Sequence, residues 1–366
     1  MTLVTKTIRG IQYYYFQDSL SADGRSQIIT TFVCRADEPQ DRVMIAKMEA
    51  SMKHIHKSLV AARAVQIYNS LHLDEIDIIG LEFLSLMYKQ LGHTIKPSEL
   101  EAIEQTFYNR YVYGTTAIEG ITLSEDETAK VLQTGLTPAN KPVPDTIAVA
   151  NFKDARGFLE SFTGDVTEKL IKDVHSILMY GMKTESGRPV PRGMYRENRV
   201  FINRSGYTPP ASELVPQSMK YLVAEYEKEK EENRHPVELV AIFHQKLEEI
   251  HPFQDGNGRT GREILNFMLT RSGLPPIYIT PRERTSYINA LEAGNSGDHA
   301  PMIEFIASRI KGTMEFYMSK TSMASLFYDA YNTPEFEKFA KEYGLEGMKE
   351  QILSRMKEIM EADELP

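Results

Sequence analysis

The chain has 366 residues, of which 42% are hydrophobic and 25% charged, proportions typical of a globular protein with a substantial core. The formal net charge is −9 and no block of Lys or Arg occurs, which argues against nucleic acid as the main partner. Cys34 is the single cysteine, so an internal disulfide and a multi-cysteine zinc site are excluded. Because no stretch approaches the roughly 20 apolar residues of a membrane helix or shows a signal peptide's apolar segment, we expect a cytoplasmic protein without a membrane partner.

The chain begins with a predicted β-hairpin over residues 1–35. Apolar positions alternate in Ile11–Tyr15, Ser21–Gly24 interrupts the run, and β-branched residues are frequent in Ile28–Val33. A helical region is predicted over 36–105, where Ile76–Tyr88 is typical of a core helix. The first helix of the region 36–105 is indicated by apolar residues at spacings of four, four and three, namely Met44, Met48, Met52 and Ile55.

The middle of the chain contains clear boundary signals. Ser124 and Glu127 form a capping box at a helix start, and three prolines in Thr137–Pro144 predict a loop. A second β-hairpin is predicted within Gly187–Pro210, on an otherwise helical body.

Two helices are predicted over Pro236–Glu249 and Gly258–Thr270, and a helical tail over 321–366. An apolar stripe on this tail either packs against the body or joins two chains into a homo-oligomer. The stripe consists of Met348, Ile352, Met356 and Ile359.

The segment between the two helices, HPFQDGNGRTGR, combines the groups that phosphoryl chemistry needs. His251 is a base that titrates near neutral pH, and Asp255 offers the hard oxygen ligand that Mg²⁺ prefers. Gly256–Gly258 can turn its N–H groups toward an anion at a helix N-terminus. Arg259 and Arg262 share a helix face three residues apart and can clamp a polyphosphate.

Simpler interpretations exist for each part of this segment. A single histidine is usually structural, and a DGNG run is usually a turn. Gly256–Gly261 also fits the dinucleotide pattern GxGxxG, but a helix precedes it and no βαβ unit surrounds it. The combination of all the groups in one segment is harder to explain in this way than any single residue.

The segment resembles the Fic signature, H-P-F-x-D-G-N-G-R-x-x-R, at every fixed position. A looser resemblance extends from about Phe107 to Lys311, and the core domain is placed at 106–320. The resemblance implies a mainly α fold, a Fic-type helical bundle with a β-hairpin flap. It also implies ATP as substrate with Mg²⁺, and a target protein bound along the flap.

The same resemblance implies a role for each motif residue. His251 is the general base for the target hydroxyl, and Asp255 holds Mg²⁺ against the α- and β-phosphates. The anion hole and the contacts to the outer phosphates are assigned to Gly256, Asn257, Gly258, Arg259 and Arg262.

Residues 115–120, TTAIEG, resemble the family's inhibitory motif through Thr115, Glu119 and Gly120. Glu119 is then expected to pair with Arg262, which removes a cation meant for the γ-phosphate. Ile121 departs from the asparagine often found in the family. For some members the resemblance also assigns the glutamate a role in removing AMP.

The flap and the nucleobase pocket are predicted from weaker likenesses. Tyr195–Pro210 is similar to the flap, and its nucleotide-facing stretch is Val200, Phe201, Ile202 and Asn203. The pocket closing over the base is assigned to Tyr287, Leu291 and Asn295, although the first two could equally be core residues.

Together these patterns predict a protein adenylyltransferase that moves AMP from Mg-ATP to a Ser, Thr or Tyr hydroxyl of a protein, including itself, and that Glu119 inhibits. Two alternatives stay open. One is another Fic-type activity, such as AMP removal or phosphate transfer, and the other is a nucleotide-binding regulatory protein without catalysis.

Overall fold

A computed structural model describes residues 2–22, 25–65, 68–184, 186–200, 207–321, 328, 332, 334–342 and 346–363. The chain divides into two compact units. Unit 1 comprises residues 1–103, 273–275 and 310–366, and unit 2 comprises residues 104–272 and 276–309. All predicted site residues fall within the ranges of unit 2, and the four-part division predicted from the sequence stays a prediction.

Unit 1 contains a three-stranded antiparallel sheet with the order β1 (Thr2–Ile8), β2 (Ile11–Ala22), β3 (Arg25–Arg35). Strands β2 and β3 form the predicted hairpin, which is confirmed. The sequence prediction lacked β1, which joins β2 through a two-residue turn at Arg9 and Gly10 with φ of 53° and 82°. Such a turn normally carries Asn-Gly, and β1 has no alternating buried positions, so its pattern is weak.

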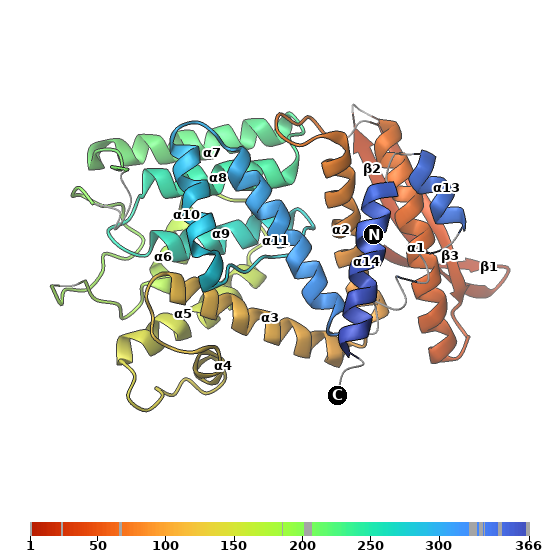
Figure 1. The fold of residues 1–366 in the computed structure, drawn as a ribbon, viewed down its shortest axis with the longest axis horizontal. Helices are drawn as coiled ribbons and strands as arrows, with labels where there is room; N and C mark the ends of the chain where they lie inside the picture. Colours follow the sequence, from red (N-terminus) through yellow and green to blue (C-terminus); the bar gives the residue numbers. More distant parts are fainter. Residues whose placement is uncertain are drawn as a thin grey trace. The chain divides into compact units, whose positions relative to one another are not determined.

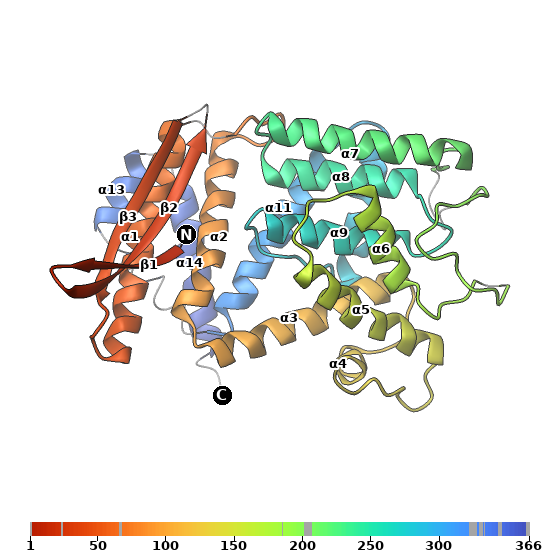
Figure 2. The ribbon, with the colours of Figure 1, turned by 180° about the vertical axis from the view of Figure 1, so that it is seen from behind.

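Helix α1 (Gln40–Val65) packs on the sheet of unit 1, as Figures 1 and 2 show. Phe16, Val33 and Ala50 share the core of this contact. The predicted helices of residues 36–105 and of the tail are confirmed as α1, α2 (Glu75–Thr94), α13 (Pro334–Glu342) and α14 (Glu346–Asp363). The side chains of the apolar tail stripe lie outside the described part of the structure, so their packing stays a prediction.

Unit 2 is built around α8 and α9, which pack against each other near its centre (Figures 1 and 2). Eleven residues of α9 are buried, and they include charged and polar side chains, which an interior tolerates only with partners or for function. The helices with residues in this unit are α3 (Pro97–Ile118), α4 (Glu125–Thr134), α5 (Val143–Ser161), α6 (Glu168–Leu178), α7 (Val215–Glu231), α8 (Pro236–Ile250), α9 (Asn257–Arg271), α10 (Arg284–Asn295) and α11 (Ala300–Met318).

The boundary predictions for unit 2 are largely confirmed. The capping box of Ser124 and Glu127 is formed at the start of α4. The predicted loop over Thr137–Pro144 is too long, since α5 begins at Val143 and accepts Pro144 in its first turn, where no N–H bond is lost.

The second predicted hairpin stays a prediction. Phe201, Ile202 and Asn203 lie outside the described residues. Residues 186–200 and 207–210 contain no strand, and Pro189 forms an isolated bridge with Lys183 outside them.

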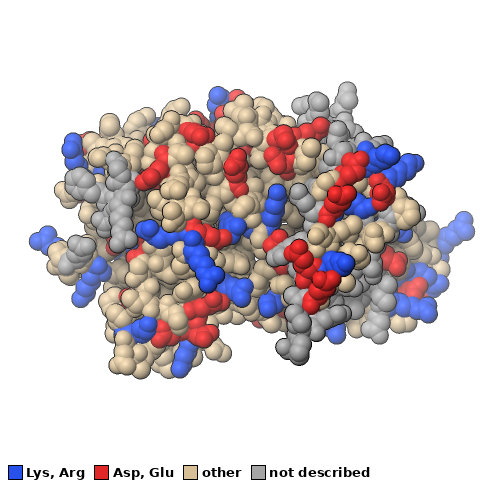
Figure 3. Space-filling view, viewed as in Figure 1, with Lys and Arg blue, Asp and Glu red and all other residues tan. Residues whose placement is uncertain are grey.

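Acidic and basic side chains are interspersed over the face that Figure 3 shows, in keeping with the net charge of −9. Among the described residues, no helix combines the length and apolar character needed to cross a bilayer.

Candidate active site

The loop between α8 and α9 has left-handed backbone at both ends. His251 ends α8 with a φ of 49°, and its N–H donates to Leu247 O. Gly256 is the N-cap of α9 with a φ of 80°, and a Cβ there would collide with the side chain of Met179. Left-handed backbone is natural for glycine but unfavourable for histidine, so the surroundings of His251 must hold it.

Arg196 supplies part of that hold, although no sequence pattern marked it. It is 4% exposed, and its Nε donates to the His251 carbonyl at 2.8 Å. The same guanidinium donates to Asn198 O at 3.1 Å and Pro210 O at 2.5 Å. Arg196 therefore ties the predicted base to both sides of the predicted flap.

His175 on α6 fixes the position of Asp255 and was also missed from the sequence. Its Nδ1 accepts from Gly193 N–H at 2.9 Å, so its Nε2 carries the proton and donates to Asp255 O at 2.9 Å. The ring stacks on Phe253, with 3.7 Å between the ring centroids. Burial lowers the pKa of His175 to about 4, which keeps this brace neutral.

His251 presents a neutral imidazole. Its Nδ1 lies 3.3 Å from Glu248 O, and because a carbonyl only accepts, Nδ1 carries the proton in this contact. Nε2 then keeps a lone pair. Burial lowers the pKa of His251, against the opposing effect of the Glu248 carbonyl. The group therefore has the protonation state of a general base at neutral pH.

Arg259 is buried with unused donors. Its Nη2 donates to Asp255 Oδ1 at 3.2 Å, while Nε and Nη1 have no hydrogen-bond partner in the described part of the chain. An unpaired buried donor costs about 1–3 kcal/mol, so an anion placed here would be bound strongly.

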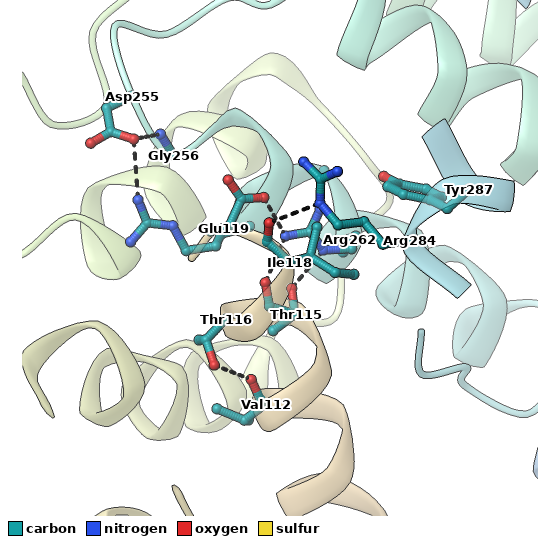
Figure 4. A network of polar contacts seen from close by, with 12 residues as sticks. Val112, Thr115, Thr116, Ile118, Glu119, Asp255, Gly256, Arg262, Arg284 and Tyr287 are labelled. Atoms are coloured by element: carbon teal, nitrogen blue, oxygen red, sulfur yellow. Dashed lines mark hydrogen bonds and ion pairs between the residues drawn. The ribbon is translucent and has the colours of Figure 1, made fainter. Parts of the chain in front are cut away.

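Arg262, in contrast, is bound through its Nε and Nη2 by the end of α3, as Figure 4 shows. Its Nε donates to Thr115 Oγ1 at 2.6 Å, and its Nη2 donates to Thr115 O at 2.9 Å and Glu119 Oε1 at 2.7 Å. Thr115 and Glu119 are four residues apart, so they lie on one face of the last helical turn. The predicted pairing of Glu119 with Arg262 is confirmed.

The Glu119 carboxylate lies where α9 begins. A Cβ on Gly258 would collide with Glu119 Oε1, so the carboxylate occupies the space beside the helix N-terminus that attracts anions. Burial would raise the pKa of Glu119, but the Arg262 guanidinium outweighs it and holds the pKa below its usual range.

Two further buried carboxyl groups, Glu248 and Glu263, flank Arg262 without having been predicted. Glu248 packs so closely on Gly261 that a Cβ there would collide with its Oε1. Burial raises the pKa of each carboxyl to about 7, partly offset in both by Arg262.

The residues assigned to the base pocket are spread around α10. Tyr287 is 2% exposed and its hydroxyl lies 2.8 Å from His244 Nε2, whereas Leu291 is partly exposed. Asn295 Oδ1 accepts from Gln245 at 3.0 Å. Of the flap residues, Val200 is partly buried, and Phe201 and Ile202 lie outside the described residues.

The residues present fit a magnesium ion that a nucleotide brings with it. In the described part of the chain no three His, Cys, Asp or Glu side chains gather to hold a metal ion by themselves. The Asp255 side chain is 45% exposed at the mouth of the site. A single carboxylate beside phosphate oxygens is a usual environment for Mg²⁺.

Residues 165–269 match the model of the Fic/DOC family. Residues 165–269 therefore form a Fic domain, and the similarity to proteins named protein adenylyltransferase extends beyond it.

Among curated relatives, protein adenylyltransferase fic-1 of Caenorhabditis elegans is 31% identical over 252 residues, 67% of this chain and 49% of the relative. Protein adenylyltransferase Fic of Nematostella vectensis is 31% identical over 229 residues, 62% and 52% of the two chains. The chain thus spans about half the length of the curated relatives it matches.

Solved structures share the fold. A Fic domain containing signaling protein from Bacteroides thetaiotaomicron has a TM-score of 0.58 at 24% identity, covering 66% of this chain and 95% of that one. Fic-1 from C. elegans has a TM-score of 0.57 at 23% identity, covering 79% and 91%.

Proposed function

We propose that this protein is an adenylyltransferase that moves AMP from ATP to a Ser, Thr or Tyr hydroxyl of a protein, itself included, and that Glu119 inhibits it. The proposal is supported by relatives named protein adenylyltransferase. The observation that carries it is the convergence of His251, Asp255, Arg259 and Arg262 around the start of α9, with Glu119 bound to Arg262.

In the proposed reaction, His251 Nε2 takes the proton of the target hydroxyl. The hydroxyl oxygen bonds to the α-phosphorus, the bond from that phosphorus to the β-phosphate oxygen breaks, and pyrophosphate leaves. The Nδ1–H contact to Glu248 O favours the required tautomer, and the charge that forms on the imidazole lies near Glu119 and Asp255.

The phosphates would lie on the N-terminus of α9. The backbone N–H groups of Gly256–Gly258 form the anion hole in this proposal, and the two unpaired donors of Arg259 take phosphate oxygens. Asp255 would hold Mg²⁺, which supplies charge neutralisation between the phosphates when bound. Arg262 would take the γ-phosphate once Glu119 has left.

Inhibition follows from competition for one position. Glu119 already satisfies Arg262 and lies beside Gly258, so a triphosphate meets a negative charge where its outer phosphates belong. A nucleotide bound beside this charge would present its α-phosphate poorly.

The remaining assignments belong to the same proposal. The target would bind along the flap and the base would lie against residues of both segments, namely Val200, Phe201, Ile202, Tyr287, Leu291 and Asn295. The proposed domains are a hairpin at 1–35, a helical region at 36–105, the Fic core at 106–320 and a tail at 321–366.

The test is to incubate Glu119→Gly protein with Mg-ATP labelled at the α- or the γ-phosphate. We expect label on protein from α-labelled ATP alone, an added mass of one AMP, and little of either in wild type. Label from γ-labelled ATP would indicate phosphate transfer and contradict AMP transfer. Adding His251→Ala should abolish labelling while nucleotide binding persists, and continued transfer would remove His251 from the base role.

A further inference from the structure

The turn that carries Glu119 is contacted by the segment Pro276–Arg284, here called the strap. Gly114 of α3 approaches it so closely that a Cβ would collide with the Ile279 carbonyl oxygen. Ile118 lies four residues after Gly114 in α3, and its carbonyl oxygen accepts from Arg284 Nε at 3.3 Å (Figure 4). The strap therefore touches one face of the last turn of α3 at two points.

The strap itself is anchored to the centre of unit 2. Asn266 on α9 pairs with both backbone groups of Ile277, at 2.9 and 2.8 Å. Glu283 accepts from the N–H and the hydroxyl of Thr280, both at 2.9 Å. Arg284 is thus presented to α3 from a fixed backbone.

The carbonyl that Arg284 binds belongs to the peptide bond leading into Glu119. The last turn of α3 has no basic residue of its own, although helix C-termini attract cations. Arg284 supplies that cation from outside the helix. Fixing this peptide bond fixes the Cα from which the Glu119 side chain reaches Arg262.

We propose that Arg284 is a positioning residue for inhibition, which holds the end of α3 so that Glu119 stays on Arg262. The proposal rests on the inhibitory role proposed for Glu119. Without Arg284 the carboxylate and the guanidinium are unchanged, but the turn between them is released more often. Arg262 is then available to a triphosphate in a larger fraction of molecules.

Arg284→Ala should raise self-modification by α-labelled Mg-ATP by about fivefold over wild type, which corresponds to roughly 1 kcal/mol, the net contribution of one hydrogen bond. Arg284→Lys, which keeps a cationic donor, should fall between the two. Arg282→Ala is the matched control, because Arg282 is exposed two residues earlier, and it should behave as wild type. Wild-type labelling by Arg284→Ala, with Glu119→Gly active beside it, would overturn the proposal.

The double variant separates positioning from direct catalysis. In the Glu119→Gly background, Arg284→Ala should have no further effect, since nothing remains to be positioned. A loss of activity in this background would show that Arg284 serves the nucleotide, and would overturn the proposal.

Amide hydrogen exchange tests the contact without any transfer reaction. In the intact chain the N–H groups of Glu119, Gly120 and Ile121 donate to α3 carbonyls at 3.1 Å. These amides should exchange faster in Arg284→Ala than in wild type or Arg282→Ala, while those of α8 stay unchanged. Equal exchange would overturn the proposal even if no variant transfers AMP, so its failure is distinct from that of the proposed function.

Discussion

Arg259 and Arg262 lie three residues apart on α9, yet their surroundings are opposite. Both are nearly buried, at 5% and 3% exposure. Arg262 donates to three acceptors at the end of α3. Arg259 has one bond, to a half-exposed carboxylate, and two buried donors without a partner in the described chain.

The difference comes from α3, because nothing in the α9 sequence distinguishes the two arginines. At the Arg262 end the site is filled by an internal acid and is stable without ligand. At the Arg259 end two buried donors have no partner in the described chain, and a bound anion would satisfy them. In the proposed complex, a phosphate chain would find one end of its binding position open and the other occupied.

The largest effect is expected on catalysis, where the two arginines should become alike. In the Glu119→Gly background, Arg259→Ala and Arg262→Ala should each lower AMP transfer by about 100- to 1,000-fold, because each removes a preorganised cation from developing phosphate charge. Initial rates with α-labelled ATP measure this. A variant that keeps full activity would show that its arginine does not bind the phosphates.

The free energy of unfolding should distinguish Arg262 from Arg259. In the chain with Glu119 present, Arg262→Met should lower the free energy of unfolding by roughly 2–4 kcal/mol, less than for a fully buried pair because the Glu119 side chain is 34% exposed. Urea unfolding measures the loss. Adding Glu119→Gly should restore part of it, since the carboxylate left without a partner is then removed. No restoration would mean that Thr115, not Glu119, dominates the network.

The groups proposed to act through their own chemistry could be named from the sequence. The signature motif places the proposed base, the proposed metal ligand and the two arginines within one segment, and the motif of residues 115–120 predicted a contact across 143 residues that the structure confirms. The α8 and α9 helices follow from their periodicity and from the proline and glycine at their ends.

The residues that brace the site could not be predicted, because they act on backbone groups far away in the chain. Arg196 binds the carbonyl of His251, 55 residues later, and His175 binds that of Asp255, 80 residues later. A backbone acceptor exists at every residue, so no residue type at the other end reveals the contact. Glu248 was missed because it lies on an ordinary helical pattern, and its unusual burial appears only in three dimensions.

The buried carboxyl of Glu248, near Arg262, should make the free energy of unfolding depend on pH. Its pKa of about 7 lies above the ordinary value of 4.5, so the folded state binds the proton more tightly than the unfolded chain. This stabilisation is complete below about pH 4.5 and is lost as pH rises through about 7. Glu248→Gln should therefore reduce the fall in unfolding free energy between pH 5 and pH 8 by about 2 kcal/mol. The exposed Glu292→Gln is the control, and an equal change in both variants would contradict the assignment.

The smallest effect should come from Arg259→Met in the chain with Glu119 present. Replacing unpaired buried donors by an apolar chain of similar length removes their desolvation cost and only one weak bond, so the free energy of unfolding should change by less than about 1 kcal/mol or rise. Urea unfolding beside Arg262→Met measures the contrast. A loss as large as that of Arg262→Met would mean that Arg259 contributes to the unliganded fold, and that the open end of the site is not held in readiness for phosphate.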